Sequence, residues 1–110
     1  MFEGVSSYLE RRGFNVQSGN ARYVSLTGSL VDEARLVAVS SDGLLRITVS
    51  GGPDGYRITV IARGSRASSR LARDLEGLGA SVDHEEERLL AVFRCSDIAE
   101  VRRVLNGFLG

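Results

Sequence analysis

The sequence has 110 residues, 43% of them hydrophobic, and a formal net charge of zero. This length holds one domain, residues 1–110, with room for a single core. The balanced charge excludes the strongly basic nucleic-acid-binding proteins, although local basic patches remain possible. All fourteen basic residues are arginine. Genome base composition or adaptation to heat explains this bias, and recognition of phosphate or carboxylate groups by guanidinium groups is the functional alternative.

The cysteine count and the apolar runs indicate a cellular compartment. A single cysteine cannot form an internal disulfide, which fits a reducing cytosol. The first residues lack the basic start and apolar run of a signal peptide. No apolar stretch approaches membrane-spanning length. We therefore expect a soluble, cytoplasmic protein with no membrane partner.

The first quarter of the chain predicts a helix followed by a hairpin. Residues 2–12 form a short amphipathic pattern with Phe2, Val5 and Leu9 on its inner face. Residues 14–16 and 22–27 read as two short strands around a Ser18-Gly19-Asn20 turn.

Residues 29–40 are compatible with two structures. Val31, Ala34, Val37 and Ala38 suit a helix capped by Ser29, whereas residues 34–40 could also begin a hairpin that turns at residues 41–43. The helix is preferred.

The middle of the chain gives the clearest strand signal. Residues 56–63 alternate strictly, and residues 44–50 form a second strand joined to them by the glycine-rich loop 51–55. Gly64 ends the strand, and Ser65 is placed to cap the next helix. The apolar stripe of that helix consists of Ala67, Leu71, Leu75 and Leu78, and Gly79 suits a left-handed C-terminal residue.

The end of the chain predicts a hairpin and a last helix. Residues 81–83 and 88–94 form the two strands, and the second is apolar on both faces, so we expect it to be central or covered on both sides. Ser96 or Asp97 caps the helix, whose inner stripe is Ile98, Val101, Leu105 and Phe108. The predicted fold class is α+β: an antiparallel sheet with helices on one face, containing a strand-helix-strand-strand-helix unit.

An internal repeat is a further possibility. The segment LERRGFNV at 9–16 aligns with LEGLGASV at 75–82, and residues 29–38 align with 96–105 after a one-residue slip. The halves would be residues 1–50 and 55–110. The first would have its initial strand moved to its end, so the strands at 44–50 and 56–63 would pair at the centre of one continuous sheet. This arrangement would be an internal pseudo-dimer.

No residue pattern predicts catalysis, a metal or a cofactor. His84 and Cys95 are the only residues of their kinds and lie on different predicted elements, so no nucleophile and base are placed together. The acidic run at 83–87 lacks the ligand spacing of a calcium or zinc site and suits a solvated turn. The glycines match no phosphate-binding fingerprint. We expect a non-catalytic protein.

Two arginine-bearing surfaces are candidates for binding. Arg66, Arg70 and Arg73 are spaced four and three apart, with Arg63 just before them, and together they could contact RNA phosphates. A solvated helix face with charges that keep the protein soluble is the alternative. The outer face of the sheet would mix arginine with apolar side chains, as protein contacts often do, or be an ordinary half-exposed sheet. Its residues are Arg46, Thr48, Arg57, Thr59, Ile61 and Arg63, alongside Leu90 and Val92.

The last helix carries a motif of an acidic cap, spaced aliphatic residues, arginine, asparagine and an aromatic residue. Its members are Asp97, Ile98, Val101, Arg102, Leu105, Asn106, Phe108 and Leu109. This helix resembles the closing helix of the small KEOPS-complex subunits of the Pcc (CTAG/Pcc) family. The preceding segments are similar to the family in their order of strand, helix, strand, strand, helix. The resemblance covers about residues 56–110, and residues 1–53 have no place in that pattern.

The resemblance implies a non-catalytic assembly subunit. The family helps to build the complex that installs threonylcarbamoyl-adenosine in transfer RNA, binds the catalytic subunit and assists tRNA capture. Carried over by position, Arg102, Leu105, Asn106 and Leu109 would bind the partner, and the chain would form a homodimer or contain a pseudo-dimer. A rearranged ferredoxin-like domain that senses a ligand or binds RNA is the alternative, with Gly64 as a ligand-site glycine.

Overall fold

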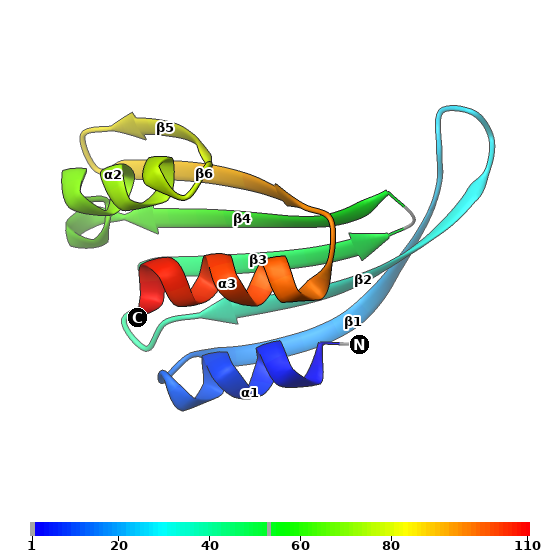
Figure 1. Cartoon of the computed structure of the whole chain (residues 1–110), viewed down its shortest axis with the longest axis horizontal. Helices are drawn as coiled ribbons and strands as arrows, with labels where there is room; N and C mark the ends of the chain where they lie inside the picture. Colours follow the sequence, from blue (N-terminus) through cyan, green and yellow to red (C-terminus); the bar gives the residue numbers. More distant parts are fainter. Residues whose placement is uncertain (1, 53) are drawn as a thin grey trace.

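The computed structural model describes residues 2–52 and 54–110, and over these residues it forms one antiparallel sheet covered by helices on one face (Figure 1). The sheet order is β1-β2-β3-β4-β6-β5. The strands are β1 (Asn15–Val24), β2 (Leu30–Val39), β3 (Leu45–Gly52), β4 (Gly55–Arg63), β5 (Ser81–Glu85) and β6 (Arg88–Cys95). The helices are α1 (Glu3–Arg11), α2 (Ser69–Gly77) and α3 (Ile98–Leu109), with a 3-10 turn, η1 (Gly64–Arg66). The predicted α+β class and the strand-helix-strand-strand-helix order of β4 to α3 are confirmed.

The hairpin of β3 and β4 lies at the centre of the sheet. The two strands pair from Leu45 with Ala62 to Gly52 with Gly55, as the alternation predicted. The predicted pairing of these strands at the centre of one continuous sheet is therefore confirmed, with β2 and β1 on one side and β6 and β5 on the other. Pro53 of the predicted loop lies outside the described residues. The duplication itself stays a prediction.

The core fills the space between the sheet and the helices. Alternate residues of β3, β4 and β6 point toward the helices and are buried, because a strand turns successive side chains to opposite faces. From the helices, Val5, Leu9, Leu75, Val101 and Leu105 are buried against them. Burial of these apolar side chains supplies the main free energy of folding.

The first predicted hairpin is wrong. Residues 18–20 do not turn: β1 runs through them as one ten-residue strand that pairs with β2 along its whole length. Gly19 has none of the positive φ that a tight hairpin turn would require of it. Pairing with a long neighbouring strand extends a segment whose local composition favours a turn.

The preferred helix at 29–40 is also wrong, and the alternative hairpin is correct. This segment is β2, hydrogen-bonded between β1 and β3, with Leu36 and Ala38 buried. The chain then turns at residues 41–43, where Gly43 has φ of 74°. The helical spacing of its apolar residues is outweighed by two rows of strand pairing and by its β-branched valines.

The helix after β4 begins later than predicted. Gly64–Arg66 forms a 3-10 turn, and Ser68 rather than Ser65 is the cap, since its hydroxyl accepts a hydrogen bond from Leu71 N. Of the predicted stripe, Ala67 and Leu75 are buried and Leu71 and Leu78 are half-buried. Gly79 ends the helix at φ of 102°, as predicted.

The last hairpin and helix are confirmed. β6 lies between β4 and β5, and the Asp97 side chain accepts a hydrogen bond from Glu100 N at the start of α3. Glu100 in turn accepts from the backbone N and the hydroxyl of Ser96, the residue before the cap, each at 2.9 Å. Only one face of β6 is covered by the helices, so Leu90 on the other face remains 36% exposed. None of the helices in the described residues is long and apolar enough to span a membrane.

Candidate binding surfaces

Cys95 and His84 do not form a reactive pair. Cys95 is buried at the end of β6, and burial is the main cause that raises the pKa of its thiol, followed by the charge of Glu100. His84 pairs across the sheet with Leu89, and six residues of β6, about 20 Å, separate that position from Cys95. The His84 ring nitrogen lies 3.0 Å from Ala67 O instead.

The acidic hairpin turn is not assembled as a metal site. Within the residues that the structure describes, no group of three or more His, Cys, Asp or Glu side chains is placed to hold a metal ion. Asp83 and Glu85 alternate with His84 along β5, so their side chains leave the strand on the opposite face.

A groove runs between α1 and α3. Its volume is about 440 Å³, and it is lined by Gly4, Tyr8, Arg11, Arg102, Arg103 and Asn106. The partner surface predicted from the sequence lies on the last helix alone and lacks the residues that α1 contributes. These helices lie at opposite ends of the chain, so no local signal could have joined them.

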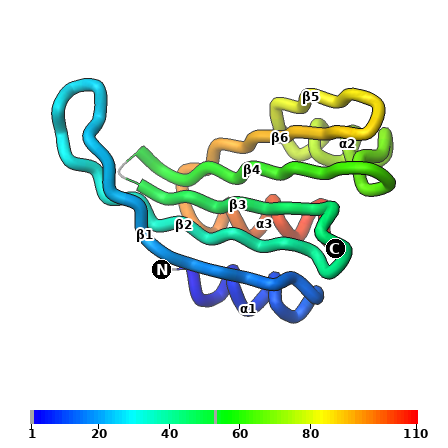
Figure 2. The backbone as a smooth tube through the Cα atoms, turned by 180° about the vertical axis from the view of Figure 1, so that it is seen from behind, coloured from blue at the N-terminus to red at the C-terminus, as the bar shows by residue number. Residues whose placement is uncertain are grey.

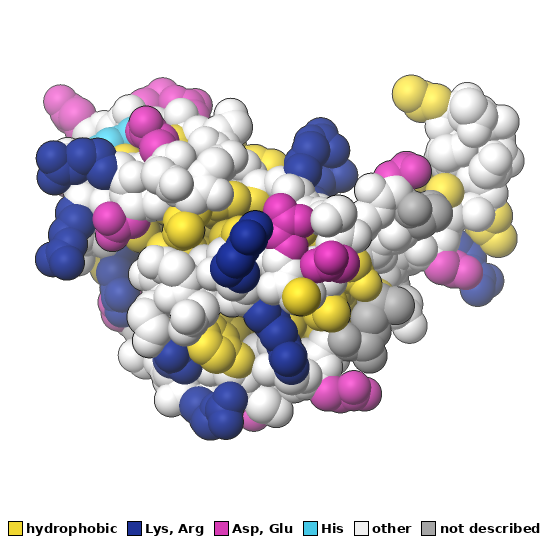
Figure 3. All heavy atoms as spheres, viewed as in Figure 1, with side chains coloured by type: hydrophobic (Ala, Val, Ile, Leu, Met, Phe, Trp, Pro, Cys, Tyr) yellow, Lys and Arg dark blue, Asp and Glu magenta, His cyan; other side chains and the backbone are white. Residues whose placement is uncertain are grey.

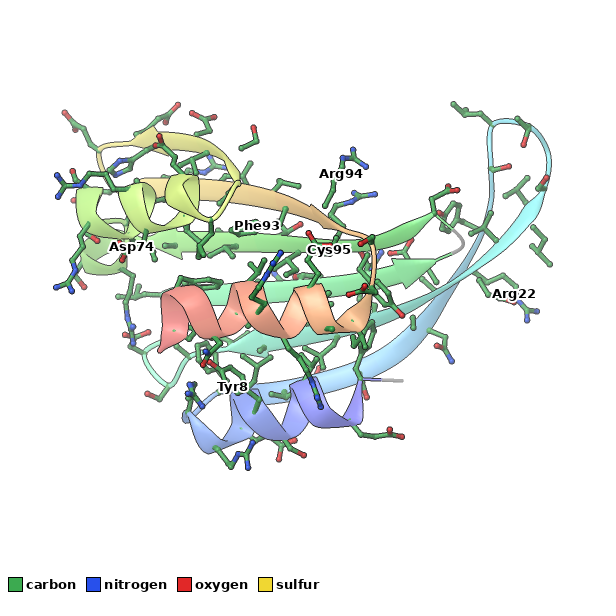
Figure 4. All side chains as sticks on the ribbon, in the orientation of Figure 1. Tyr8, Arg22, Asp74, Phe93, Arg94 and Cys95 are labelled. Atoms are coloured by element: carbon green, nitrogen blue, oxygen red, sulfur yellow. The ribbon has the colours of Figure 1, made fainter. Side chains whose placement is uncertain are left out.

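Specific contacts set the shape of this groove. The Arg102 guanidinium lies against Gly4, where a Cβ atom would be 1.6 Å from Nη2, so only glycine fits under this arginine conformation. Tyr8 sits between the two helices, with its hydroxyl 3.5 Å from Leu105 O and from Asn106 Oδ1 (Figure 4). Arg12 covers the Tyr8 ring at 3.8 Å and donates to Gly110 O at 2.7 Å. The tyrosine and arginines thus tie the first helix to the last.

The predicted partner-binding residues divide into two groups. Arg102 and Asn106 are exposed and line the groove. Leu105 is 1% exposed, so it belongs to the core, and Leu109 is half-buried. The inner stripe of α3 also includes Val104, which the sequence reasoning did not name. Direct contact with a partner is therefore available to the two polar residues and not to Leu105.

The predicted arginine stripe does not lie on one helix. Arg70 and Arg73 lie exposed on α2, but Arg66 belongs to the 3-10 turn before it, and Arg63 lies at the end of β4. Arg66 Nε donates to Asp42 Oδ2, in the adjacent β2–β3 turn, at 2.9 Å. Helical spacing does not relate Arg66 to Arg70 and Arg73, because α2 begins three residues after Arg66. The nucleic-acid role of these four residues stays a prediction.

Asp42 anchors the turn between β2 and β3. Its Oδ1 accepts from the Ser40 hydroxyl and from Leu44 N, and Oδ2 accepts from Arg66. The hydrogen bond from Ser40, followed by those from Leu44 and Arg66, lowers the Asp42 pKa to about 2. Arg66 is thereby tied through its Nε to the β2–β3 turn, while its side chain remains 45% exposed.

The other face of the sheet is not covered by the helices (Figure 2). We call it the open face. Strand register places two arginine pairs directly opposite each other there, Arg57 with Arg94 and Arg63 with Arg88. Among the described residues none of these four arginines forms an ion pair, and like charges opposite each other destabilise a sheet. Arg57 and Arg63 were predicted on this face, whereas Arg88 and Arg94 join them through a strand register that the sequence alone does not reveal.

The centre of the open face is apolar and hydroxylated. Between the arginine pairs lie Thr59 with Val92 and Ile61 with Leu90, and Thr48 adjoins Thr59. Carboxylates of the same face lie toward its margins, at Glu33, Asp83 and Glu85. The face therefore offers guanidinium groups at both ends of a mixed apolar strip.

Comparisons with protein-family models, curated proteins and solved structures give no match for this chain.

Proposed function

We propose that this chain is a non-catalytic assembly subunit that binds a helix of a partner protein in the groove between α1 and α3. The groove itself carries the proposal: two helices from opposite chain ends leave a hollow of about 440 Å³ bordered by exposed polar side chains. A pair of neighbouring helices is a common receptor for a third, amphipathic helix. α3 has twelve residues, about 18 Å, which is enough for three turns of contact.

The charge of the groove specifies the chemistry of the partner. Three of its lining residues are the arginines Arg11, Arg102 and Arg103, and within the described residues its lining includes no carboxylate. Guanidinium groups bind carboxylates through paired hydrogen bonds. A partner helix with acidic side chains is therefore favoured, and Asn106 adds a neutral group that both donates and accepts hydrogen bonds.

The resemblance of the last helix to the Pcc family names a candidate partner. On this proposal the partner is the catalytic threonylcarbamoyl-transferase subunit of the KEOPS complex, and the chain supports tRNA modification without chemistry of its own. The cytoplasm is the proposed location, which suits a chain whose only cysteine is free and buried. The pairing of β3 with β4 inside one chain supports the pseudo-dimer that the resemblance led us to expect.

A double variant tests this function. Arg102→Ala with Asn106→Ala removes two exposed groove residues and leaves the core intact, so we expect little change in melting temperature and at least a tenfold loss of affinity, about 1.4 kcal/mol. Isothermal titration against the catalytic subunit measures it. Arg70→Ala, an exposed arginine of α2, is the matched control and should bind normally. Failure of the wild-type protein to bind, or equal binding by the double variant, would overturn the proposal.

Contact with RNA through the open face is a second candidate function. The observation that favours it is the two opposed arginine pairs, whose like charges destabilise the sheet unless an anion binds over them. Arg57 and Arg63 are six residues apart, about 20 Å along β4. A single ligand that contacts both arginine pairs must therefore be an extended polyanion. The face lacks aromatic side chains between the arginine pairs, which favours phosphate contacts over base stacking.

The salt dependence of tRNA binding distinguishes the two arginine surfaces. Replacing Arg57 and Arg94 with alanine should weaken binding and lower the slope of log affinity against log salt by about two, one for each lost phosphate contact. The matched control replaces Arg70 and Arg73 on α2. If the control loses binding and the sheet variant does not, the helix is the RNA surface. If the wild type does not bind tRNA at low salt, this second function is wrong.

A further inference from the structure

The hairpin of β1 and β2 extends beyond the rest of the sheet. β2 pairs with β3 only from Ala34 onward, whereas β1 and β2 continue to pair as far as Val24 with Leu30. We call residues 21–33 the arm; it projects away from the helices and from the β3–β4 turn (Figures 1 and 2). Four residue pairs of about 3.4 Å each, plus the turn, give it a reach of roughly 14 Å or more.

The arm is preformed by its own hydrogen bonds. Ser25 N donates to Ser29 O at 2.8 Å, and Gly28 N donates to Ser25 O at 2.9 Å. Gly28 has φ of 85°, which glycine adopts without strain. At the base of the arm Arg22 and Asp32 form an ion pair at 2.7 Å. The projection is thus a defined hairpin that presents side chains in fixed places.

Exposed apolar side chains are concentrated on the arm. Of the five large hydrophobic residues exposed in the described part of the chain, four lie there, and the fifth is Leu90. They are Tyr23 at 47%, Val24 at 66%, Leu26 at 109% and Leu30 at 64% exposure. Figure 3 shows apolar side chains at the far end of this projection. Such concentration on one segment marks an interaction surface.

β1 is the outermost strand of the sheet; α1 lies beside the first part of its outer side, bordering a hollow at Ser18, Gly19 and Asn20, and the edge is free beyond it along the arm (Figure 1). β1 has ten residues, lies at the end of the sheet order and contains one charged residue, Arg22, and no proline. The opposite edge, β5, has five residues, and Asp83, His84 and Glu85 are three of them. Short length and charge are the usual means of preventing edge-to-edge pairing. By this criterion β5 is blocked and β1 is available.

A knob and a hole lie four residues apart on this strand. Tyr23 and Gly19 are on the same face of β1, and the absent side chain of Gly19 leaves a hollow of about 230 Å³ bordered by Gln17, Ala21, Arg35 and Val37. A Cβ atom at Gly19 would meet nothing within 4 Å. Tyr23 lies four residues further along the same strand, too far away to fill the hollow of its own copy.

We propose that two copies of this chain pair through their β1 edges, antiparallel about a twofold axis at Ala21. In this register Tyr23 of each copy lies opposite Gly19 of the other, because opposite residues of an antiparallel pair share a face. Each tyrosine then fills the hollow of the second copy, the arrangement in which aromatic residues stabilise glycine in sheets. Val24 lies opposite Ser18 of the second copy. The same surface of β1 forms the interface in both copies, as a twofold axis requires.

The zero net charge of the chain removes the long-range repulsion that would oppose pairing. The result is a continuous sheet of twelve strands, two copies of the six-stranded sheet, whose remaining edges are the charged β5 strands. This interface lies on a different element from the α1–α3 groove. It therefore goes beyond the proposed function and does not depend on it.

Sedimentation equilibrium of the purified chain tests the dimer. We expect a concentration-dependent monomer–dimer equilibrium for the wild type. Gly19→Val places a side chain in the hollow, and its Cβ meets nothing within 4 Å, so we expect the variant to fold and to weaken dimerisation at least tenfold. Tyr23→Ser removes the knob and should act in the same direction. The groove variant Arg102→Ala with Asn106→Ala is the control and should dimerise like the wild type.

A cysteine placed at the twofold axis tests the register. In a Cys95→Ala background, Ala21→Cys puts two thiols directly opposite each other, at Cα separations of about 4.5–5.5 Å that a disulfide spans. Oxidation should yield a covalent dimer. Asp83→Cys on the β5 edge is the matched control and should not cross-link in this way. A wild type that stays monomeric at the highest concentration reached, or a Gly19→Val variant that dimerises equally well, would overturn the proposal.

Discussion

The two halves of the chain contain the same helix-to-strand junction and continue differently after it. Where α1 leads into β1, Leu9 O accepts hydrogen bonds from Arg12 N at 3.0 Å and from Phe14 N at 3.2 Å. Where α2 leads into β5, Leu75 O accepts from Leu78 N at 3.2 Å and from Ala80 N at 3.0 Å. Leu9 and Leu75 are both fully buried, and Gly13 and Gly79 both have positive φ. The aligned segments LERRGFNV and LEGLGASV thus fold alike.

After these junctions the two halves differ in how far helices cover the sheet. The second half adds α3, which packs its apolar stripe over the sheet, whereas the first half continues from β1 into the long hairpin that ends in the arm. The segment aligned with α3 is strand β2. The same junction therefore supports either a short, helix-covered hairpin or a long one with an exposed end. What decides is whether the following residues pack a helix or pair with neighbouring strands.

The largest expected effect tests whether the two buried leucines are equivalent. Leu9→Ala and Leu75→Ala each remove a fully buried side chain, so each should lower the free energy of unfolding by about 2–5 kcal/mol. Urea denaturation followed by circular dichroism measures both. Leu26→Ala on the arm is the control and should change little, since that side chain is fully exposed. A small cost at Leu9 alone would show that α1 does not contribute to the core as α2 does.

A smaller effect is expected at the two glycines that end the helices. Gly13 and Gly79 have φ of 87° and 102°, where a Cβ atom is strained, so alanine at either should cost about 1–2 kcal/mol. Gly77 is the matched control. It lies within α2, with open space around its Cα and no positive φ, so Gly77→Ala should stabilise by about 0.5–1 kcal/mol. Unequal losses in the free energy of unfolding for Gly13→Ala and Gly79→Ala would show that the two junctions are not equivalent.

The smallest expected effect concerns the ion pair that links the two halves. The folded-state pKa of Asp42 is about 2, below its unfolded value of about 4, so its contribution to stability is present above pH 4 and is lost as the pH falls toward 2. Asp42→Asn removes this titration. The difference in unfolding midpoint between wild type and variant should therefore shrink between pH 5 and pH 2. A difference that does not change with pH would mean that the Ser40, Leu44 and Arg66 contacts do not stabilise the carboxylate in solution.

Local signals in the sequence determined the second half of the fold. The alternation of β4, the acidic cap at Asp97 and the glycine at position 79 each act within a few residues, where the chemistry of the neighbours decides the backbone. The resemblance of the last helix named the groove residues Arg102 and Asn106, and helical spacing places them outside the inner stripe.

Long-range pairing decided the rest. Residues 29–40 carry spacing that suits a helix, and residues 18–20 have turn composition, yet both became strand because β1, β2 and β3 satisfy one another's backbone groups over long registers. The same registers created the opposed arginines of the open face and the knob and hole of β1, and helix packing joined α1 to α3. Each of these features depends on residues distant in sequence, whose pairing no window of neighbouring residues encodes.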